Sequence, residues 1–496
     1  MSEPLALSVT DAPIDRADAV VLYVDDRANF GPIARGVWKR TGLDFDRIAT
    51  ATGFFGRPGH MIDIAAPADP DCDRLVVLGR GIEGGNDTLA AWADRGGSLV
   101  AKLESFGVSH AAVVVDDPGI TPQKLAALAG GARLRAYRFE KYQSRSGGHR
   151  ERLESLAFHV GSVRGMDAAL ADRIAVVEGT LLARDLVNEP ANHLGPEDMA
   201  QAASKLSELG VDVEVLTEDD MKRLGMGALL AVGQGSVRPP RLVVMSWNGG
   251  RKGRAPLAVL GKGINFDTGG ISIKAAPSME NMKGDMAGAA AVVGLMRALA
   301  TRRAAVNVVG VIALAENMPD GNAFRPGDIL TAMSGKTIEV ISTDAEGRLV
   351  LADALWYTQD RFKPAAMIDL ATLTGAMLVA LGHDYAGLFT NTESLAVQLE
   401  AAGRATGEKL WHMPMAPAYD KLIDSRFADI KNQGGRNGGS IIAAHFLAHF
   451  VNDTPWAHLD IVGTAFGAPS SETNTSWASG FGVALLDRFI RDNYEA

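Results

Sequence analysis

The sequence contains only one cysteine, Cys72, among its 496 residues. A single thiol excludes an intrachain disulfide framework and any zinc site built from several cysteines. No run approaches the roughly 18 apolar residues of a membrane-spanning helix. The first twenty residues also lack the basic and apolar regions of a signal peptide. These absences predict a cytoplasmic protein without a membrane partner.

The chain also lacks a polybasic stretch, and its 49 basic residues stand against 59 acidic ones, for a net charge of -10. Nucleic-acid binding is therefore not predicted. Hydrophobic residues make up 47% and charged residues 22%, as in soluble globular proteins. The length suits two or three domains, because a single core seldom grows beyond roughly 250–300 residues.

The N-terminal third alternates short β-branched runs with helical stretches, which is typical of an α/β layer around a largely parallel sheet. The predicted strands are 19–24, 74–79 and 111–115, and the predicted helices are 88–106 and 122–129. The polar stretch Tyr142–Ser155 is predicted to be a linker or an exposed loop. A long helix is predicted over Met166–Val187, because Pro190 prevents its continuation. We expect a smaller N-terminal α/β domain at 1–160, a connecting helix at 161–190 and a larger C-terminal domain at 191–496.

The second half repeats the α/β alternation more regularly and predicts a central mixed sheet flanked by helices. The predicted strands are 242–247, 257–261, 307–313, 337–342 and 366–371, and the predicted helices are 285–300, 349–360 and 440–451. Ligands of open α/β sheets bind beyond the carboxyl ends of the strands. The polar residues just past these ends are therefore the candidates for a functional site.

Four carboxylates lie near two predicted strand ends and a helix start. They are Asp267, Asp285, Asp344 and Glu346. Like charges gathered together repel, and protonation or bound cations must relieve the repulsion. Two divalent ions would balance four carboxylates, and oxygen ligands suit zinc, manganese or magnesium. Any one of these acids is more simply a solvated surface residue, but the set lies in glycine-rich, otherwise apolar segments.

The spacing of Asp344 and Glu346 favours a loop at this point. On a helix the two carboxylates would point to nearly opposite sides, whereas in an extended turn residues two apart face the same way. Gly347 is expected to give the backbone the freedom for that turn. Both carboxylates could then reach one metal pair, with Arg348 close by.

These segments resemble the leucine aminopeptidase (cytosol aminopeptidase) family of two-metal exopeptidases. STDAEGRL, at 342–349, differs by one residue from that family's NTDAEGRL signature, and GKGINFDTGGISIK, at 261–274, matches its other metal-binding block. The resemblance continues through ARDLVNEPANHLGPE, ENMPDGNAFRPGD, IDLATLTGAM, GGRNGGSIIAAHFL and PWAHLDIVGTAF. It thus extends from about residue 180 to about residue 490, and it implies a non-catalytic N-terminal domain.

The resemblance implies a catalytic residue set. The implied ligands of two divalent ions, Zn²⁺ or Mn²⁺, are Lys262, Asp267, Asp285, Asp344 and Glu346. Lys262 would bind as a neutral amine with a strongly depressed pKa, because an ammonium cannot coordinate a metal. Lys274 is implied to polarise the scissile carbonyl, and Arg348 to hold a bicarbonate that acts as general base. A metal-activated water would attack the first peptide carbonyl.

The substrate is implied to be a peptide with a free N-terminus, from which leucine and other mainly hydrophobic residues are released. Met282, one predicted helical turn before Asp285, would line the pocket for the first side chain. Thr372, Leu373 and Gly375 would contact the substrate. Ser342 replaces the family's usual asparagine, which leaves the metal set intact and bears on specificity or affinity. The family also implies a homohexamer.

Three other motifs resemble known binding motifs, but each has a simpler explanation. Gly79, Gly81 and Gly84 form a GxGxxG, but Asp116, the acidic residue that follows the next predicted strand, comes 32 residues after Gly84, where about 20 is expected, so an ordinary turn is favoured. Gly335-Lys336-Thr337 lacks the earlier glycine of a phosphate loop. His445 and His449 have zincin spacing, but Phe446 replaces the required glutamate. They are therefore interpreted as core or interface histidines, and Cys72 as a packed or surface thiol.

Two alternative functions remain open at this stage. Two-metal carboxylate sites also serve phosphatases and nucleases. An additional nucleic-acid-binding role is known for some relatives of the family, although the acidic charge balance of this chain argues against it.

Overall fold

The computed structural model describes residues 4–25, 29–68, 72–81, 87–116, 119–144 and 152–495. These form two compact units, the first comprising 1–177 with 470–476 and the second comprising 178–469 with 477–496. The long predicted helix is present as α5, Met166–Asn188, and belongs to both units. The domain limits expected from the sequence stay a prediction.

The first unit is a six-stranded sheet in the order β1-β6-β5-β2-β4-β3, in which only β3 runs antiparallel to its neighbour. Its elements are β1 Ala6–Thr10, β2 Ala17–Val24, α1 Pro32–Arg40, α2 Phe45–Thr52, β3 Met61–Ala65, β4 Cys72–Gly79, α3 Leu89–Ser105, β5 His110–Val114, α4 Pro122–Arg135 and β6 Ser155–His159. The predicted strands and helices of this region are all present. Ser155, placed in a linker or loop by the sequence, instead begins β6, and 145–151 lie outside the described residues.

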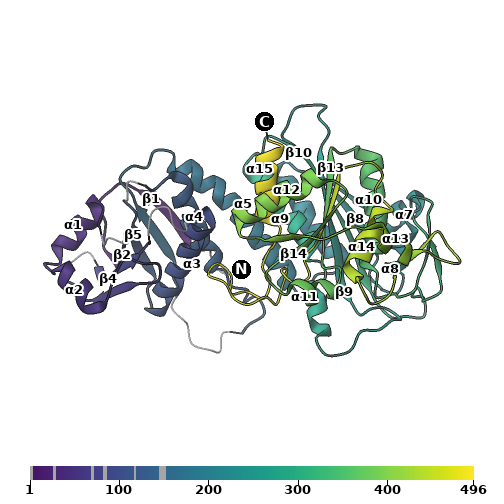
Figure 1. The fold of residues 1–496 in the computed structure, drawn as a ribbon. Coiled ribbons are helices and arrows are strands. Elements are labelled where there is room, and N and C mark those ends of the chain that lie inside the picture. Colours follow the sequence, from purple (N-terminus) through teal and green to yellow (C-terminus); the bar gives the residue numbers. More distant parts are fainter. Residues whose placement is uncertain are drawn as a thin grey trace. The chain divides into compact units, whose positions relative to one another are not determined.

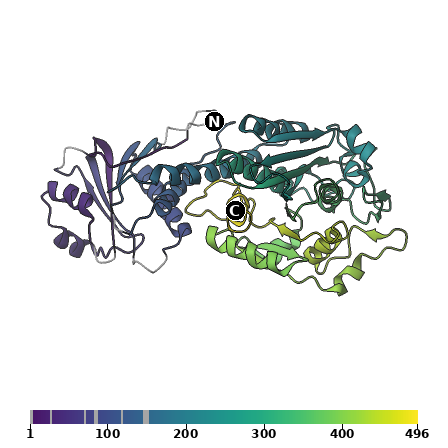
Figure 2. The same ribbon diagram turned by 90° about the horizontal axis from the view of Figure 1, so that it is seen from above.

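Helices cover both faces of this sheet, with α1 and α2 on one face and α3 and α4 on the other (Figure 1, Figure 2). The side chains of β2 alternate between the two cores as a strand requires. Val21 packs with Leu99 and Leu128 of α3 and α4. Leu22 packs with Trp38 of α1 on the opposite face. Both faces are therefore apolar, which explains the continuous hydrophobic run in the sequence.

The second unit is built on an eight-stranded mixed sheet in the order β15-β14-β17-β13-β9-β10-β8-β7. Its strands are β7 Asp212–Leu216, β8 Arg241–Asn248, β9 Leu257–Asp267, β10 Asn307–Asn317, β13 Ala366–Ala371, β14 Ala386–Thr390, β15 Leu410–His412 and β17 Trp456–Asp460. A separate small sheet contains β11 Ile329–Thr331, β12 Thr337–Glu339 and β16 Ile430–Lys431. The two-unit α/β fold with a larger mixed-sheet unit confirms the predicted fold class.

Helices flank the larger sheet, with α9, α12 and α15 on one side and α8, α10 and α14 on the other (Figure 1). The helices of this unit are α6 Pro196–Ser204, α7 Glu218–Leu224, α8 Gly227–Gly233, α9 Ala287–Thr301, α10 Gly347–Phe362, α11 Gly375–Leu381, α12 Glu393–Thr406, α13 Pro417–Asp420, α14 Gly439–Ala448 and α15 Val483–Asn493. One prediction was wrong in detail: the strand expected at 337–342 ends at Glu339 and lies in the small sheet. The residues after it form the loop that carries Asp344.

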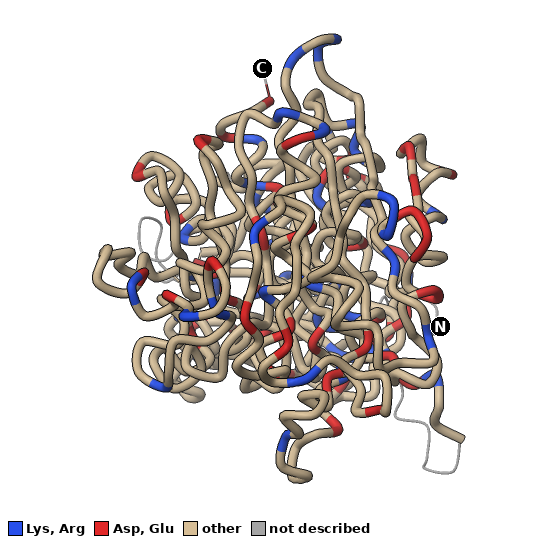
Figure 3. Tube along the Cα trace, turned by 90° about the vertical axis from the view of Figure 1, so that its right-hand side faces the viewer, with Lys and Arg blue, Asp and Glu red and all other residues tan. Residues whose placement is uncertain are grey.

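Charged residues of both signs are interspersed along the side of the chain drawn in Figure 3. That view shows no continuous basic stripe among the described residues on that side. Within the described ranges, no helix is both long enough and apolar enough to cross a bilayer.

Candidate active site

A β-bulge in β9 brings Lys262 and Asp267 to the same face of the large sheet. The pairing with β10 passes from Ile264 opposite Ala315 to Phe266 opposite Glu316, so Asn265 is an extra residue in β9. Residues five apart on a regular strand face opposite sides, and one extra residue reverses that parity. The bulge therefore directs both side chains to one site.

Two glycines return the chain from Asp267 to Lys274. Gly269 and Gly270 have φ angles of +86° and +64°, in the left-handed region that favours glycine. A side-chain carbon at Gly269 would also lie 2.5 Å from the carbonyl oxygen of Ser272. The resulting turn places Nζ of Lys274 2.8 Å from Oδ2 of Asp267.

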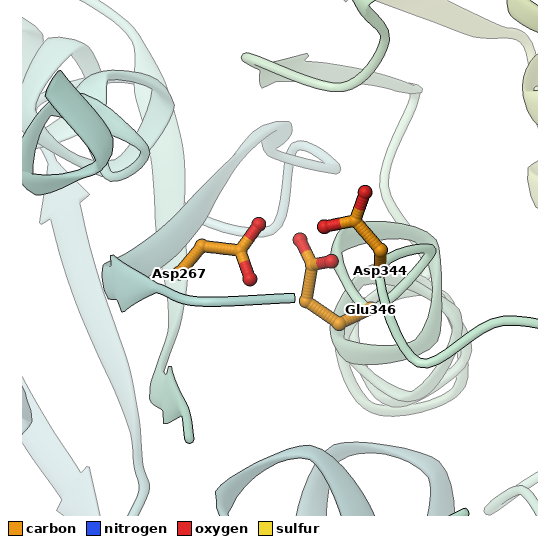
Figure 4. A group of neighbouring side chains, drawn as sticks. All are labelled: Asp267, Asp344 and Glu346. Atoms are coloured by element: carbon orange, nitrogen blue, oxygen red, sulfur yellow. The ribbon is translucent and has the colours of Figure 1, made fainter. Parts of the chain in front are cut away.

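The carboxylates of Asp267, Asp344 and Glu346 converge, each offering an oxygen within 4.8 Å of the others. Figure 4 shows the three side chains turned toward one another, Asp267 from the end of β9 and both Asp344 and Glu346 from the segment just before α10. Asp285 joins the group through Lys262, whose Nζ lies 2.8 Å from Oδ1 of Asp285 and 2.9 Å from Oε1 of Glu346. The structure thus brings together all five residues that the sequence singled out as candidate metal ligands.

The two lysines divide the four carboxylates into pairs. Lys262 bridges Asp285 and Glu346, while Lys274 contacts Asp267 and Asp344. Burial lowers the pKa of Lys262, but the surrounding carboxylates outweigh burial and raise the pKa above its ordinary value. The neutral form of Lys262 expected beside two dications stays a prediction for the metal-bound protein.

The donor set fits divalent cations. Oδ2 of Asp285 and Oε2 of Glu346 are buried without a hydrogen-bond partner, and such atoms are costly unless a cation or proton satisfies them. Burial raises the pKa of Asp285 to about 8, although Lys262 acts to lower it. Burial and the neighbouring Asp267 likewise raise the pKa of Glu346. Hard carboxylate oxygens in this arrangement suit zinc, manganese or magnesium.

The loop carrying Asp344 is a tight turn rather than the extended segment expected from the sequence. The amide of Ala345 donates to the carbonyl of Ser342 at 3.3 Å, and α10 begins two residues later. Oγ of Ser342 accepts from the amide of Asp344 at 3.2 Å. Serine therefore supplies a side-chain oxygen to this turn, a contact that asparagine oxygen can also make.

Gly347 has a different role from the one expected. It is the first residue of α10, and its φ is not in the left-handed region. A side-chain carbon there would lie 2.5 Å from Cε and 2.8 Å from Nζ of Lys262. The missing side chain makes room for Lys262, and the turn does not depend on it.

Arg348 is buried beside the carboxylates, and its guanidinium does not use all of its hydrogen-bond donors. Nη1 donates to the carbonyl of Asn432 at 2.8 Å, and Nε is buried without a hydrogen-bond partner. Burial lowers the pKa of Arg348 to about 10, while Glu346 and other acids act to raise it. A buried guanidinium with an unused donor fits an anion.

The segment after β13 borders the same cluster. Oγ1 of Thr372 donates to Oδ1 of Asp285 at 2.7 Å, and its carbonyl accepts from Nζ of Lys262 at 3.0 Å. Gly375 begins α11, and nothing lies within 4 Å of a side-chain carbon built on it. The amide of Leu373 donates to Asp460 at 3.1 Å.

Met282 lies close to Asp285 in the chain but outside the helix expected there. It belongs to a 3₁₀ helix, η2, at Met279–Gly284, and α9 starts only at Ala287. The amide of Asp285 donates to the carbonyl of Met282 at 3.3 Å. The two residues are therefore held together by a tight turn, not by a shared α-helical face.

Three buried residues that sequence reasoning missed support the site. Nδ2 of Asn317 donates to Oδ1 of Asp267 at 2.8 Å and to the carbonyl of Thr343 at 3.0 Å. Asn432 holds the turn at 342–345, and Asp460 holds the segment after β13. A signal for Asn317 was present, because it comes two residues after the apolar run of β10, at the carboxyl end of that strand.

The other motifs have structural explanations. Gly79 ends β4, and a side-chain carbon on it would collide with the backbone at Gly56 and Arg57; Gly84 lies outside the described residues. Asp116, the acidic residue considered for that motif, accepts from the amides of Ile33 and Ala34 at the start of α1, whereas the helix that follows the three glycines is α3.

The remaining candidates also lie outside the carboxylate cluster. His445 and His449 both face Asp420, with His449 Nε2 2.8 Å from Oδ1. Gly335, with a φ of +83°, lies in the turn before β12. Cys72 is buried at the start of β4.

Comparison with known families addresses the same segments. Residues 181–487 match the catalytic domain of the cytosol aminopeptidase family, and residues 21–146 match the N-terminal domain of that family. The chain belongs to the cytosol aminopeptidase family. The resemblance inferred from STDAEGRL and GKGINFDTGGISIK is thereby confirmed.

Relatives in this family align along nearly the whole chain. A probable cytosol aminopeptidase of Bradyrhizobium sp. strain BTAi1 is 57% identical over 480 residues, covering 96% of each chain. One from Chelativorans sp. strain BNC1 is 52% identical over 499 residues, covering 100% of each. A solved tomato leucine aminopeptidase mutant is 32% identical with a TM-score of 0.86, covering 99% of this chain and 97% of that one. The bottromycin maturation enzyme BotP in complex with Mn is 32% identical with a TM-score of 0.83, covering 96% of this chain and 99% of that one.

Membership in the cytosol aminopeptidase family fixes the general class of the protein. The chain is an aminopeptidase-type hydrolase, and the family is metal-dependent. The acidic cluster of Asp267, Asp344 and Glu346 fits that dependence.

Proposed function

We propose that this protein removes N-terminal amino acids, mainly leucine and other hydrophobic residues, from peptides with a free N-terminus. The observation that carries the proposal is the convergence of Asp267, Asp344 and Glu346 on one point, with Lys262 linking Asp285 to the same group. Two buried carboxylate oxygens without partners support cations as the missing component.

Two divalent ions, zinc or manganese, would be held by Lys262, Asp267, Asp285, Asp344 and Glu346. When bound, such ions activate a water molecule and polarise a carbonyl. Lys262 would lose its proton to coordinate, since its amine is otherwise an ammonium between carboxylates. Bound cations would also release Lys274 from Asp267 and Asp344.

Lys274 and Arg348 would then act on the substrate side. Nζ of Lys274 would orient the scissile carbonyl and stabilise the negative charge that develops on its oxygen. Arg348, buried with an unused Nε donor, would hold a bicarbonate that serves as general base. The free α-amine of the substrate would bind at the metal pair, and this requirement makes the enzyme an exopeptidase.

Residues around the cluster would position the peptide. Thr372 and Leu373 would contact its backbone, and Gly375 would leave space beside it. Met282 would line the pocket for the first side chain. Ser342 would act through the turn that carries Asp344 and so tune affinity or specificity.

The test compares leucyl anilide, its N-acetylated form and a phosphate ester as substrates. We expect hydrolysis of the free amine alone, its loss with a chelator, and its return with Zn²⁺ or Mn²⁺. Bicarbonate should stimulate the wild type but not Arg348→Ala. Hydrolysis of the phosphate ester alone would favour a two-metal phosphatase or nuclease and contradict the proposal.

We also propose a cytoplasmic homohexamer. The location follows the names of the cytosol aminopeptidase relatives. Ile273 and Phe427, apolar and 63% and 70% exposed, are the kind of residue that assembly covers. A monomer in sedimentation would contradict the hexamer. Nucleic acid is not an expected partner, which a salt-dependent gel shift would check.

A further inference from the structure

Asn432, just after β16, uses every polar group it has. Its Oδ1 accepts from the amides of Ile341 at 2.8 Å and Ser342 at 3.3 Å. Its Nδ2 donates to the carbonyls of Ser342 at 2.7 Å and Ala345 at 3.4 Å. A carboxamide can make four such bonds, and all four end on the turn that carries Asp344.

The main chain of Asn432 connects that turn to two other parts of the site. Its amide donates to the carbonyl of Glu339 at 3.0 Å, at the end of β12. Its carbonyl accepts from Nη1 of Arg348 at 2.8 Å. One residue therefore fixes the strand before the turn, the turn itself and the guanidinium that follows it.

The side chain is fully buried, with no exposed area, so water cannot replace these bonds. An aspartate would keep the acceptors but place an oxygen against the carbonyl of Ser342. An alanine would remove the partner of two amides and of the Ala345 carbonyl, and would leave the Ser342 carbonyl only its bond from the amide of Ala345. Among side chains of this size, only asparagine satisfies both sides of the turn.

We propose that Asn432 is the positioning residue of the metal site: its carboxamide clamps the 341–345 turn so that Asp344 and Glu346 converge with Asp267, and its carbonyl aims Arg348. The role assigned to the metals and to Arg348 rests on the proposed function. The clamp on the turn does not, because it is a property of the chain alone.

The test measures hydrogen exchange and Mn²⁺ binding on the full chain. In Asn432→Ala, amides of 341–346 should exchange at least about tenfold faster without metal, since their local opening becomes easier. Mn²⁺ affinity by calorimetry should fall by about 10–100-fold, as for other groups that orient metal ligands. Asn432→Asp should show the same effects, and it replaces the alanine variant in both measurements if that variant does not fold.

Asn307 provides a matched control. Its carboxamide clamps another loop in the same manner, donating to the carbonyls of Arg251 at 2.9 Å and Arg254 at 3.1 Å and accepting from Gly250 at 2.9 Å. Asn307→Ala should speed exchange at 250–254 and leave Mn²⁺ affinity unchanged. This control distinguishes the general effect of losing an asparagine that holds a loop from the specific effect of losing Asn432 beside the carboxylates.

Wild-type exchange at 341–346 together with wild-type Mn²⁺ affinity in the Asn432 variants would overturn the proposal. An equal rise of exchange throughout the second unit, α12 included, would also overturn it, because the effect would then be global. Neither measurement needs peptide hydrolysis. A wild-type protein that does not hydrolyse peptides would therefore contradict the proposed function but not the proposed role of Asn432 in holding the turn.

Discussion

A side-chain carbon on Gly347 would lie 2.5 Å from Cε of Lys262. Lys262 in turn lies within 3 Å of a carboxylate oxygen of both Asp285 and Glu346. The close approach of Gly347 therefore restricts the position of the amine that links Asp285 to Glu346. No local backbone requirement demands glycine there, because its φ is ordinary.

Gly347→Ala should consequently damage the site although alanine is the better helix former by about 1 kcal/mol. The added methyl group must displace Lys262, and such overpacking costs about 1–3 kcal/mol. We expect a lower thermal midpoint and weaker metal binding, measured by differential scanning fluorimetry and metal analysis. Gly36→Ala, in α1 with nothing within 4 Å of the new carbon, is the control and should be neutral or stabilising. Equal behaviour of the two variants would contradict the packing argument.

Glu346→Ala and Lys274→Ala should separate metal binding from turnover. Glu346 offers two oxygens to the cluster, one of them without a partner, so its removal should abolish activity and reduce bound metal. Lys274 is proposed to act on the substrate, and its removal should lower kcat by about 10²–10³-fold with metal retained. Metal content by mass spectrometry decides between the roles. Loss of metal from the Lys274 variant would show that the two lysines have been assigned wrongly.

The sequence revealed the composition of the site better than its geometry. Four carboxylates in glycine-rich segments sufficed to predict that Asp267, Asp344 and Glu346 converge, as they do. The bulge at Asn265 could not be predicted, because it exists only in the pairing of β9 with β10. Without it Lys262 and Asp267 would face opposite sides of the sheet.

Supporting residues were missed for a related reason. Asn432 lies almost ninety residues after the turn it holds. Its partners are main-chain atoms, and main-chain contacts cannot be inferred from the pattern of side chains in a sequence. The strand expected at 337–342 was misjudged in extent because its partner, β16, is only two residues long. Gly347 was assigned to turn flexibility since its contact with Lys262 is visible only in three dimensions.

The hydroxyl of Thr374 should matter for substrate binding, although it touches none of the proposed metal ligands. It donates to Oδ2 of Asp460 at 2.6 Å and lies 2.8 Å from Oγ of Ser440, while Asp460 also accepts from Leu373. Thr374→Val removes one hydrogen-bond donor from the buried carboxylate of Asp460, and an unsatisfied buried group of this kind costs about 1–3 kcal/mol of free energy. We expect a KM for leucyl anilide raised about tenfold, with metal content unchanged.

Thr374→Ser keeps the hydroxyl and should restore the KM. Thr358→Val is the control for loss of a buried hydroxyl, since Oγ1 of Thr358 donates only to the carbonyl of Ala354 within α10. An unchanged KM in Thr374→Val, or an equal rise in Thr358→Val, would show that the link from Asp460 to Leu373 does not position the substrate.

Asp353, fully buried in α10, should make stability depend on pH. Its carboxylate accepts from the amides of Leu229 at 2.8 Å and Met333 at 2.7 Å. Burial raises the pKa of Asp353 to about 7, although these backbone donors act to lower it. In the unfolded chain the pKa is about 3.9. Between these values the folded state binds more protons, so the free energy of unfolding contributed by this group falls as pH rises from about 4 to about 7 and is constant above that window.

Asp353→Asn removes the titrating group and places an amide against one of the two backbone donors, so it should be less stable than the wild type at every pH. Because only the wild type carries the ionisation cost, its advantage over the variant should shrink between pH 4.5 and pH 7.5. Urea unfolding of both proteins across this range measures the difference directly. An advantage that stays constant, or grows with pH, would mean that the backbone donors outweigh burial and that Asp353 is ionised throughout.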